Sequence, residues 1–171
     1  APIIMKSQEK YTFITGASAG LGRELAIECA RRGRNLVLVA LPGRNLRQFC
    51  MELERRFGIL AVSYECDLTN EQVLGSLVKD VLSSYSLDQL INNAGVGGSN
   101  RFEEATPEYL DLIIHLNIRA TTMLTRLLLP ELRSHSRANI INIASVAAFG
   151  PLPYKTIYPA SKAFIYSFSR S

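Results

Sequence analysis

The segment IYPASKAF (157–164) places a tyrosine four residues before a lysine, Tyr158 and Lys162. Residues four apart in a helix lie on the same face, one turn from each other. A phenol with an ordinary pKa of about 10 is a weak acid at neutral pH, and a neighbouring ammonium favours its ionised form. The pair is therefore suited to exchange a proton with a substrate oxygen. The same spacing is common on helix surfaces, so the pair alone does not establish catalysis.

Two other polar residues occupy positions that invite a functional role. Ser145 follows the apolar run NIINIA (139–144), which predicts a buried strand, so its hydroxyl is expected at a strand's carboxyl end. Asn117 falls inside a predicted long helix, where asparagine is unfavourable by propensity. A serine in such a position is, by itself, more often a strand-end cap, and an asparagine in such a position is more often a satisfied buried amide.

The segment TGASAGLG leaves one predicted strand and opens a helix. Its glycines, Gly16, Gly20 and Gly22, permit a tight turn, a close backbone approach and close packing of helix on strand. The helix N-terminus offers free N–H groups and the positive end of its dipole to a pyrophosphate, and Ser18 adds a hydroxyl. This pattern predicts nucleotide binding, although a glycine triplet can also be purely structural.

The elements that must position these residues alternate along the chain. Predicted strands cover 11–15, 35–40, 60–65, part of 87–95 and 139–144, and predicted helices cover 20–32, 44–57, about 70–85, 106–132 and 155–170. Such alternation predicts one α/β domain over 1–171, a doubly wound parallel sheet covered on both faces. Ligands bind outside the carboxyl ends of such strands. This rule selects 16–22, 40–44, 66–68, 92–98 and 145–153.

Composition excludes several classes of function. The net charge is +4, but the basic residues are scattered, so nucleic acid is not an expected partner. The three cysteines, Cys29, Cys50 and Cys66, lack metal-ligand spacing and indicate a reducing compartment. No metal site, no signal segment and no apolar run of membrane-spanning length is expected. The protein is predicted to be soluble and cytoplasmic.

An ordered set of motifs carries a family resemblance. TGASAGLG, CDLT, NNAG, NIASVAA and YPASK occur in the order and at the spacing of the short-chain dehydrogenase/reductases, over essentially the whole chain. The resemblance implies a Rossmann fold, a nicotinamide cofactor and hydride transfer between a carbonyl and an alcohol. It places the family's catalytic tetrad on Asn117, Ser145, Tyr158 and Lys162. It also implies that Lys162 bonds the nicotinamide ribose and that Asn117 holds a water in a proton relay.

The resemblance also implies cofactor contacts. Asp67 matches the residue that contacts the adenine amino group, and Asn93, Ala94 and Gly95 match the turn beside the adenine-side ribose. The expected cofactor-binding residues are Gly16, Ser18, Gly20, Leu21, Gly22, Arg44, Asp67, Leu68, Asn93, Ala94, Gly95, Tyr158 and Lys162.

The choice between NAD(H) and NADP(H) is expected to depend on the end of the second strand. Ala40 stands where NAD-preferring members carry an aspartate. Leu41 and Ala19 stand at positions that are often basic in NADP-preferring members. Arg44 is the nearest cation that could reach a 2′-phosphate, although it is equally a solvated residue at a helix start. Because no acid excludes the phosphate, we predict NADP(H) over NAD(H).

The family pattern leaves two functional alternatives. The chain ends inside the helix that carries Tyr158, whereas the family's domain usually continues, so we expect a truncated chain with an apolar sheet edge at 139–144. The first alternative is an NADP(H)-dependent carbonyl reductase or alcohol dehydrogenase. The second is a nucleotide-binding protein without turnover. A homodimer or homotetramer through the helices 106–132 and 155–170 is expected, with a mainly apolar substrate beside FGPLPYKT (149–156).

Overall fold

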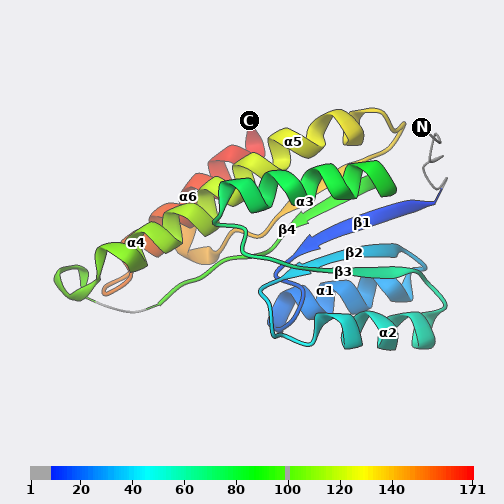
Figure 1. Ribbon diagram of the computed structural model, residues 1–171. Coiled ribbons are helices and arrows are strands. Elements are labelled where there is room, and N and C mark those ends of the chain that lie inside the picture. The colour runs from blue at the N-terminus through cyan, green and yellow to red at the C-terminus, as the bar shows by residue number, and fades with distance from the viewer. Residues whose placement is uncertain (1–8, 99–100) are drawn as a thin grey trace.

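The fold is a five-stranded parallel sheet in the order β3-β2-β1-β4-β5. The computed structural model describes residues 9–98 and 101–171 (Figure 1). The strands are β1 Lys10–Thr15, β2 Asn35–Ala40, β3 Ala61–Glu65, β4 Ser86–Asn92 and β5 Asn139–Asn142. The strand order reverses direction between β1 and β4, which is the switch point where such sheets bind ligands.

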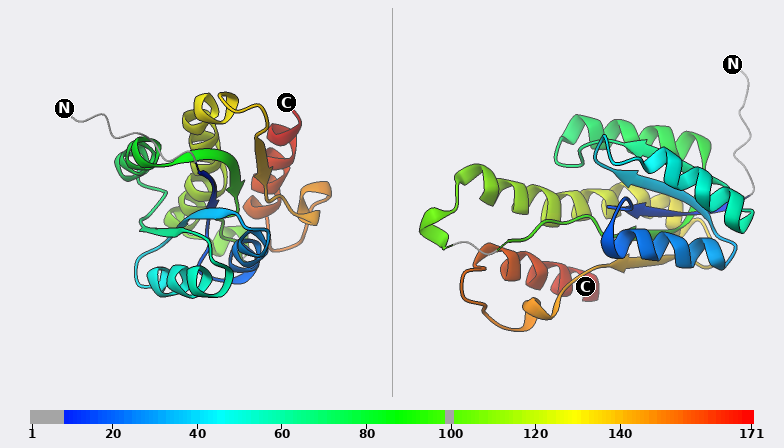
Figure 2. Two further views of the ribbon diagram at one scale, coloured as in Figure 1. Left: turned by 90° about the vertical axis from the view of Figure 1, so that its right-hand side faces the viewer. Right: turned by 90° about the horizontal axis from the view of Figure 1, so that it is seen from below.

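Helices cover both faces of this sheet. The helices are α1 Gly20–Arg31, α2 Leu46–Phe57, α3 Glu71–Ser84, α4 Pro107–Ile113, α5 Thr121–Arg133 and α6 Ile157–Arg170. Figures 1 and 2 show α1 and α2 on one face, and α3 with the long α4–α5 helix on the other. Helix α6 packs beside α4 and β5. The predicted doubly wound architecture is confirmed.

Successive side chains of the inner strands pack into two separate hydrophobic cores, one on each face of the sheet. Phe13 and Val37 belong to the core under α3 and α5, whereas Ile14 and Leu38 belong to the core under α1 and α2. All four side chains are fully buried. A strand buried on both faces needs apolar residues at successive positions, and this explains the continuous apolar runs of β1 and β2.

Local capping chemistry sets the start of two helices. The Asn70 side chain accepts hydrogen bonds from the backbone N–H groups of Gln72 (3.0 Å) and Val73 (3.1 Å), so Asn70 caps α3. Thr106 caps α4 by accepting from the N–H of Tyr109 (3.3 Å), and Pro107 takes the first helical position. These helix starts agree with the sequence prediction.

The predicted helix 106–132 differs from the observed one in its middle. A π-helical segment, Ile114–Ala120, joins α4 to α5, and Asn117 lies within it. By length and composition alone, the continuous helix Pro107–Arg133 is long and apolar enough to cross a membrane. This finding corrects the expectation that the chain has no apolar segment of membrane-spanning length. In the structure its buried side chains, among them Leu124 and Leu128, pack on the sheet instead.

The predicted buried strand 139–144 is also corrected. Strand β5 is shorter, Asn139–Asn142, and pairs only with β4 in the described part of the chain. Ile140 and Ile141 are 37% and 40% exposed, so β5 forms an apolar sheet edge. The apolar sheet edge expected at 139–144 is therefore present, although α5 and α6 both contact β5.

Candidate active site

The glycine loop between β1 and α1 is packed too closely for side chains at two positions. Gly16 has φ 66°, and a Cβ added there would lie 2.9 Å from both Ala94 Cα and Asn93 Nδ2. A Cβ on Gly22 would lie 2.9 Å from the carbonyl carbon of Gly16 and closer still to its oxygen. Both glycines are therefore required by space, and Gly16 also by its backbone conformation.

Thr15, which the sequence reasoning did not single out, fixes this loop to the NNAG turn. Its hydroxyl oxygen accepts from the backbone N–H groups of Asn93 (3.0 Å) and Ala94 (2.9 Å). In return the Asn93 side chain donates to the carbonyls of Thr15 (3.0 Å) and Gly16 (3.2 Å). The threonine at the end of TFIT, directly before the first glycine, was the available signal. These bonds hold the ends of β1 and β4 in register.

A cavity of about 390 Å³ opens at this edge of the sheet. Seven of the predicted cofactor residues line it: Gly16, Ser18, Arg44, Asp67, Leu68, Ala94 and Gly95. Four others, Gly20, Leu21, Gly22 and Asn93, lie outside its lining. Gly22 and Asn93 act by packing, as described above, and Leu21 is 53% exposed in the first turn of α1. Leu112 and Leu116 of the long helix form an apolar wall that was not predicted.

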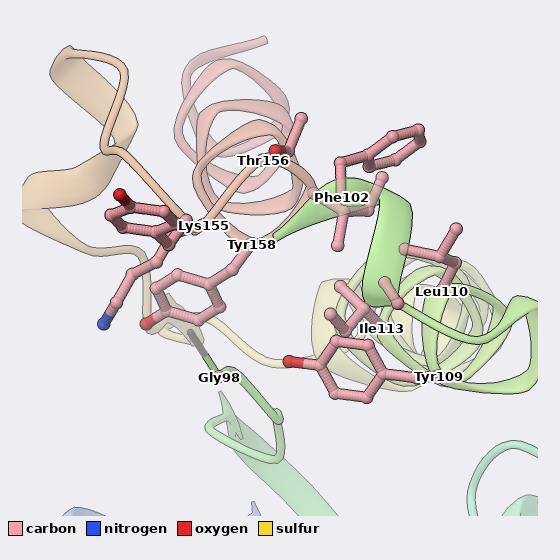
Figure 3. A pocket seen from close by; sticks show the side chains of 11 residues that line it. Gly98, Phe102, Tyr109, Leu110, Ile113, Lys155, Thr156 and Tyr158 are labelled. Carbon is pink, nitrogen blue, oxygen red and sulfur yellow. The ribbon is translucent and has the colours of Figure 1, made fainter. Parts of the chain in front are cut away.

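A second, smaller hollow contains Tyr158. Figure 3 shows the Tyr158 ring between Gly98 and the loop before α6, with the Tyr109 hydroxyl turned towards the same space. Phe102, Leu110 and Ile113 supply apolar lining. The segment 95–98 connects the two spaces, because Gly95 lines the larger cavity and Gly98 the smaller.

Lys162 is buried beneath Tyr158, only 6% exposed. Its Nζ lies 5.8 Å from the centre of the Tyr158 ring and donates a hydrogen bond to the Ile143 carbonyl (2.8 Å). Burial lowers the pKa of the Lys162 ammonium from its usual value, because the charged form is poorly solvated there. The structure thus places Tyr158 and Lys162 as the spacing predicted.

Asn117 ties three segments of the site together. Its side chain exchanges two hydrogen bonds with the Val96 backbone, both 2.9 Å, and donates to the Ser161 hydroxyl (3.0 Å). Ser161 in turn donates to the Tyr158 carbonyl (2.7 Å). Ser161, inside the YPASK motif, is a second residue that the sequence reasoning missed. Asn117 is a satisfied buried amide, and its partners are the residues of the site.

Ser145 lies at the end of β5, as predicted, and caps a short 3₁₀ helix, Val146–Phe149. Its Oγ accepts from the Ala147 N–H (3.1 Å) and, among the described residues, makes no hydrogen bond with Tyr158. The 3₁₀ helix packs on α6, where Phe149 and Tyr166 make an edge-to-face contact at 4.8 Å. Ser145 is therefore held near α6, although its hydroxyl is engaged in capping.

The cysteines and acidic residues form no competing site. Burial raises the pKa of all three thiols, that of Cys50 to about 12, which keeps them protonated and unreactive at neutral pH. No group of three or more His, Cys, Asp or Glu side chains suited to a metal occurs within 9–98 and 101–171.

Comparison with known proteins identifies the relatives of this arrangement. The family model described as short chain dehydrogenase matches residues 10–171. Mouse 17-beta-hydroxysteroid dehydrogenase type 3 is 34% identical over 170 residues, which are 98% of this chain and 55% of the mouse protein. The very-long-chain 3-oxoacyl-CoA reductase of Anas platyrhynchos is 31% identical, with 94% of this chain and 53% of the relative covered. The chain thus spans about half the length of these relatives.

A solved structure gives the same result for the fold. The short-chain dehydrogenase of Sphingobium yanoikuyae in complex with NADPH superposes with a TM-score of 0.88 at 34% identity. The match covers 94% of this chain and 63% of that chain.

Proposed function

The chain belongs to the short-chain dehydrogenase family, and from this membership we propose that it transfers a hydride between NADP(H) and a carbonyl or secondary alcohol, with Tyr158 as the proton donor and acceptor. One observation carries the proposal. The segment 95–98 runs from the nucleotide-sized cavity to the hollow that holds Tyr158, so a cofactor and a proton donor would meet at one point.

The residues present are suited to a dinucleotide. Gly16 and Gly22 leave no room for side chains and bring bare backbone to the start of α1, where N–H groups and the helix dipole favour a pyrophosphate. Asp67 lines the cavity at the position expected for adenine, between Cys66 and Leu68. When bound, the nicotinamide supplies the hydride.

Side chains of the protein carry out the proposed proton transfer to or from the substrate oxygen. Tyr158 lines the smaller hollow, and its hydroxyl lies at the end of the ring that points away from Tyr109 (Figure 3), where we propose that it protonates an alkoxide or deprotonates an alcohol. Lys162 sits below the ring, and Asn117 fixes the backbone at Val96 and, through Ser161, at Tyr158. We propose that the Ser145 hydroxyl donates to the substrate oxygen, which its capping bond allows because Oγ acts there as the acceptor.

Turnover tests this proposal. Purified protein should oxidise NADPH in the presence of at least one ketone or β-ketoacyl thioester from a broad panel. Tyr158→Phe should lower kcat by on the order of 10²- to 10⁴-fold while the Kd for NADPH changes far less, because the phenol acts mainly on the proton. NADPH binding without any turnover would instead support the non-catalytic alternative, and activity that survives in Tyr158→Phe would exclude the mechanism.

The preference for NADP(H) is a separate proposal. Among the described residues, Asp67 is the one carboxylate in the cavity lining, and Ala40 and Leu41 leave the end of β2 uncharged. Arg44 lines the cavity and supplies a cation. Glu65 is nearby, but its carboxylate accepts from the Gly43 N–H (3.2 Å) and lies outside the lining.

Binding measurements with matched variants test this preference. Arg44→Ala should raise the Kd for NADPH about tenfold or more and leave that for NADH unchanged, since the lost contact is to the 2′-phosphate. Arg47→Ala is the control, because Arg47 is exposed on α2 and does not line this cavity. Tighter binding of NADH than NADPH by the wild type would refute the assignment.

We also propose a cytoplasmic homodimer or homotetramer. The support for assembly is the apolar surface left exposed on Leu112 and Ile114 of the long helix and on Phe164 of α6. Recovery of the protein only with membranes after lysis would contradict the location.

A further inference from the structure

Gly97 lies directly against the Tyr158 ring. A Cβ built on Gly97 would lie 2.7 Å from Cδ2, 2.8 Å from Cε2 and 3.2 Å from Cγ of Tyr158. Such separations are well inside van der Waals contact for two carbon atoms. The ring therefore rests on the bare backbone of residue 97, at the point where the two cavities join.

The backbone conformation does not explain this glycine. The glycines with positive φ in the described chain are Gly16, Gly20, Gly33, Gly43 and Gly58, and Gly97 is not among them. A left-handed backbone is therefore not what requires glycine at position 97. The remaining reason for glycine is the space that the Tyr158 ring occupies.

The ring has little freedom to retreat from an added methyl group. Tyr158 is the second residue of α6, and its carbonyl accepts a hydrogen bond from the Ser161 hydroxyl (2.7 Å). The clash reaches Cγ, close to the main chain, so rotation about the outer bonds cannot relieve it. The facing loop is equally fixed, since Asn117 holds both backbone groups of Val96.

The adjacent glycine provides a useful contrast. A Cβ on Gly98 would meet chiefly the hydroxyl of Tyr109, the far end of a flexible side chain. Tyr109 can move its tip at low cost, and this tip faces the smaller hollow (Figure 3). The two neighbouring glycines therefore contact two tyrosines in different ways, one at the base of the ring and one at its tip.

We propose that Gly97 is a positioning residue: its lack of a side chain sets the place of the Tyr158 phenol relative to the cofactor and the substrate carbonyl. The inference rests on the proposed role of Tyr158 in proton transfer. A misplacement of about 1 Å at a reacting group costs on the order of 10²-fold in rate. Gly97→Ala should accordingly lower kcat by about 10²-fold with little change in the Kd for NADPH.

Two matched variants separate positioning from a general disturbance. Gly75→Ala adds a methyl group to a glycine of α3 that lines neither cavity and has nothing within 4 Å of its missing Cβ, and it should keep kcat within about twofold. Gly98→Ala should change KM for the substrate more than kcat, because it moves the Tyr109 tip. Equal loss of kcat in Gly97→Ala and Gly75→Ala would overturn the proposal.

A stability cycle tests the contact without any need for turnover. Gly97→Ala should lower the thermal midpoint by roughly 3–8 °C, as expected for overpacking in a domain of this size. In a Tyr158→Ala background, which lacks the ring, the same change should have almost no effect. If Gly97→Ala does not fold alone, Tyr158→Ala should restore folding. An undiminished effect without the ring would overturn the contact, whereas an intact cycle in an inactive protein would refute only the proposed function.

Discussion

At the scale of single residues, the site contains a buried cation, Lys162, whose burial lowers the stability of the fold and whose charge serves the proposed reaction. Lys162 is 6% exposed, its one hydrogen bond to protein is to the Ile143 carbonyl, and no carboxylate lies against it among the described ion pairs. Burying an ammonium without a counter-ion costs free energy, which is why its pKa falls. Such a residue is tolerated where its charge serves a neighbouring group, here the Tyr158 phenol.

This burial gives Lys162 a signature in the pH dependence of stability. Its pKa is lowered in the folded protein, so between that value and the ordinary 10.5 the unfolded chain binds more protons. Stability rises with pH wherever the unfolded state binds more protons. The wild type should therefore gain stability relative to Lys162→Met as pH increases through this window, and the cost of the buried charge should be fully present below it.

Denaturant unfolding of wild type and Lys162→Met from pH 7 to 10, without cofactor, measures this difference. Lys79→Met on the exposed side of α3 is the control and should show no such trend. The same Lys162→Met should lower kcat by on the order of 10²- to 10⁴-fold. A stability difference that is constant across the range would show that the ammonium is not desolvated.

At the scale of elements, the glycine loop fixes the distance between β1 and α1. A Cβ on Gly22 would meet Gly16 and the Asn93 side chain, both of which are held by their own hydrogen bonds. Gly22→Ala should therefore lower the free energy of unfolding by about 1–3 kcal/mol through overpacking and weaken NADPH binding by forcing the loop outward.

A second helical glycine supplies the control for this prediction. Gly75 lies in α3 with nothing near its missing Cβ, so Gly75→Ala should stabilise the protein by up to about 1 kcal/mol. Chemical unfolding and NADPH fluorescence titration measure both effects. Equal behaviour of Gly22→Ala and Gly75→Ala would mean that the loop relaxes freely and that the close packing has no energetic consequence.

The elements also show what the sequence could predict. The strands, the helix caps and the carboxyl-edge cluster follow from local patterns, because apolar runs, Asn70, Thr106 and the glycines act within a few residues of themselves. The π-helical segment does not, since local spacing over 106–132 is compatible with a regular α-helix. Asn117 is held there by hydrogen bonds to Val96, 21 residues away. A contact over this separation arises only from the tertiary fold and cannot be predicted from local sequence.

The two site residues that were not predicted, Thr15 and Ser161, were missed for the same reason. Thr15 and Ser161 act through partners 78 and 44 residues distant, Asn93 and Asn117. Each lies inside a motif that was identified by other residues. The motif therefore gave its position in the chain, but not its role in the site. The Gly97–Tyr158 contact likewise joins segments that no short window of sequence contains.

At the scale of the whole molecule, apolar side chains remain exposed on α4–α5 and α6. Phe164 is 39% exposed and stacks on Phe168 at 5.8 Å, and Ile114 of the long helix is also 39% exposed. Paired helices with apolar surface are suited to bury it against a second copy of the chain, because a two-fold interface brings the same patch to itself.

Sedimentation velocity with one charged substitution tests this assembly. The wild type should sediment as a dimer or tetramer, and Phe164→Glu should shift it towards the monomer, since a carboxylate cannot be buried in an apolar interface without cost. Met51→Glu is the matched control, because Met51 is 60% exposed on α2, on the opposite face of the sheet from these helices (Figure 1), and its variant should assemble like the wild type. A wild-type monomer, or equal dissociation by both variants, would place the interface elsewhere. Since Phe164 lies two residues beyond Lys162, loss of assembly accompanied by loss of turnover would further show that the interface supports the helix that carries the reacting pair.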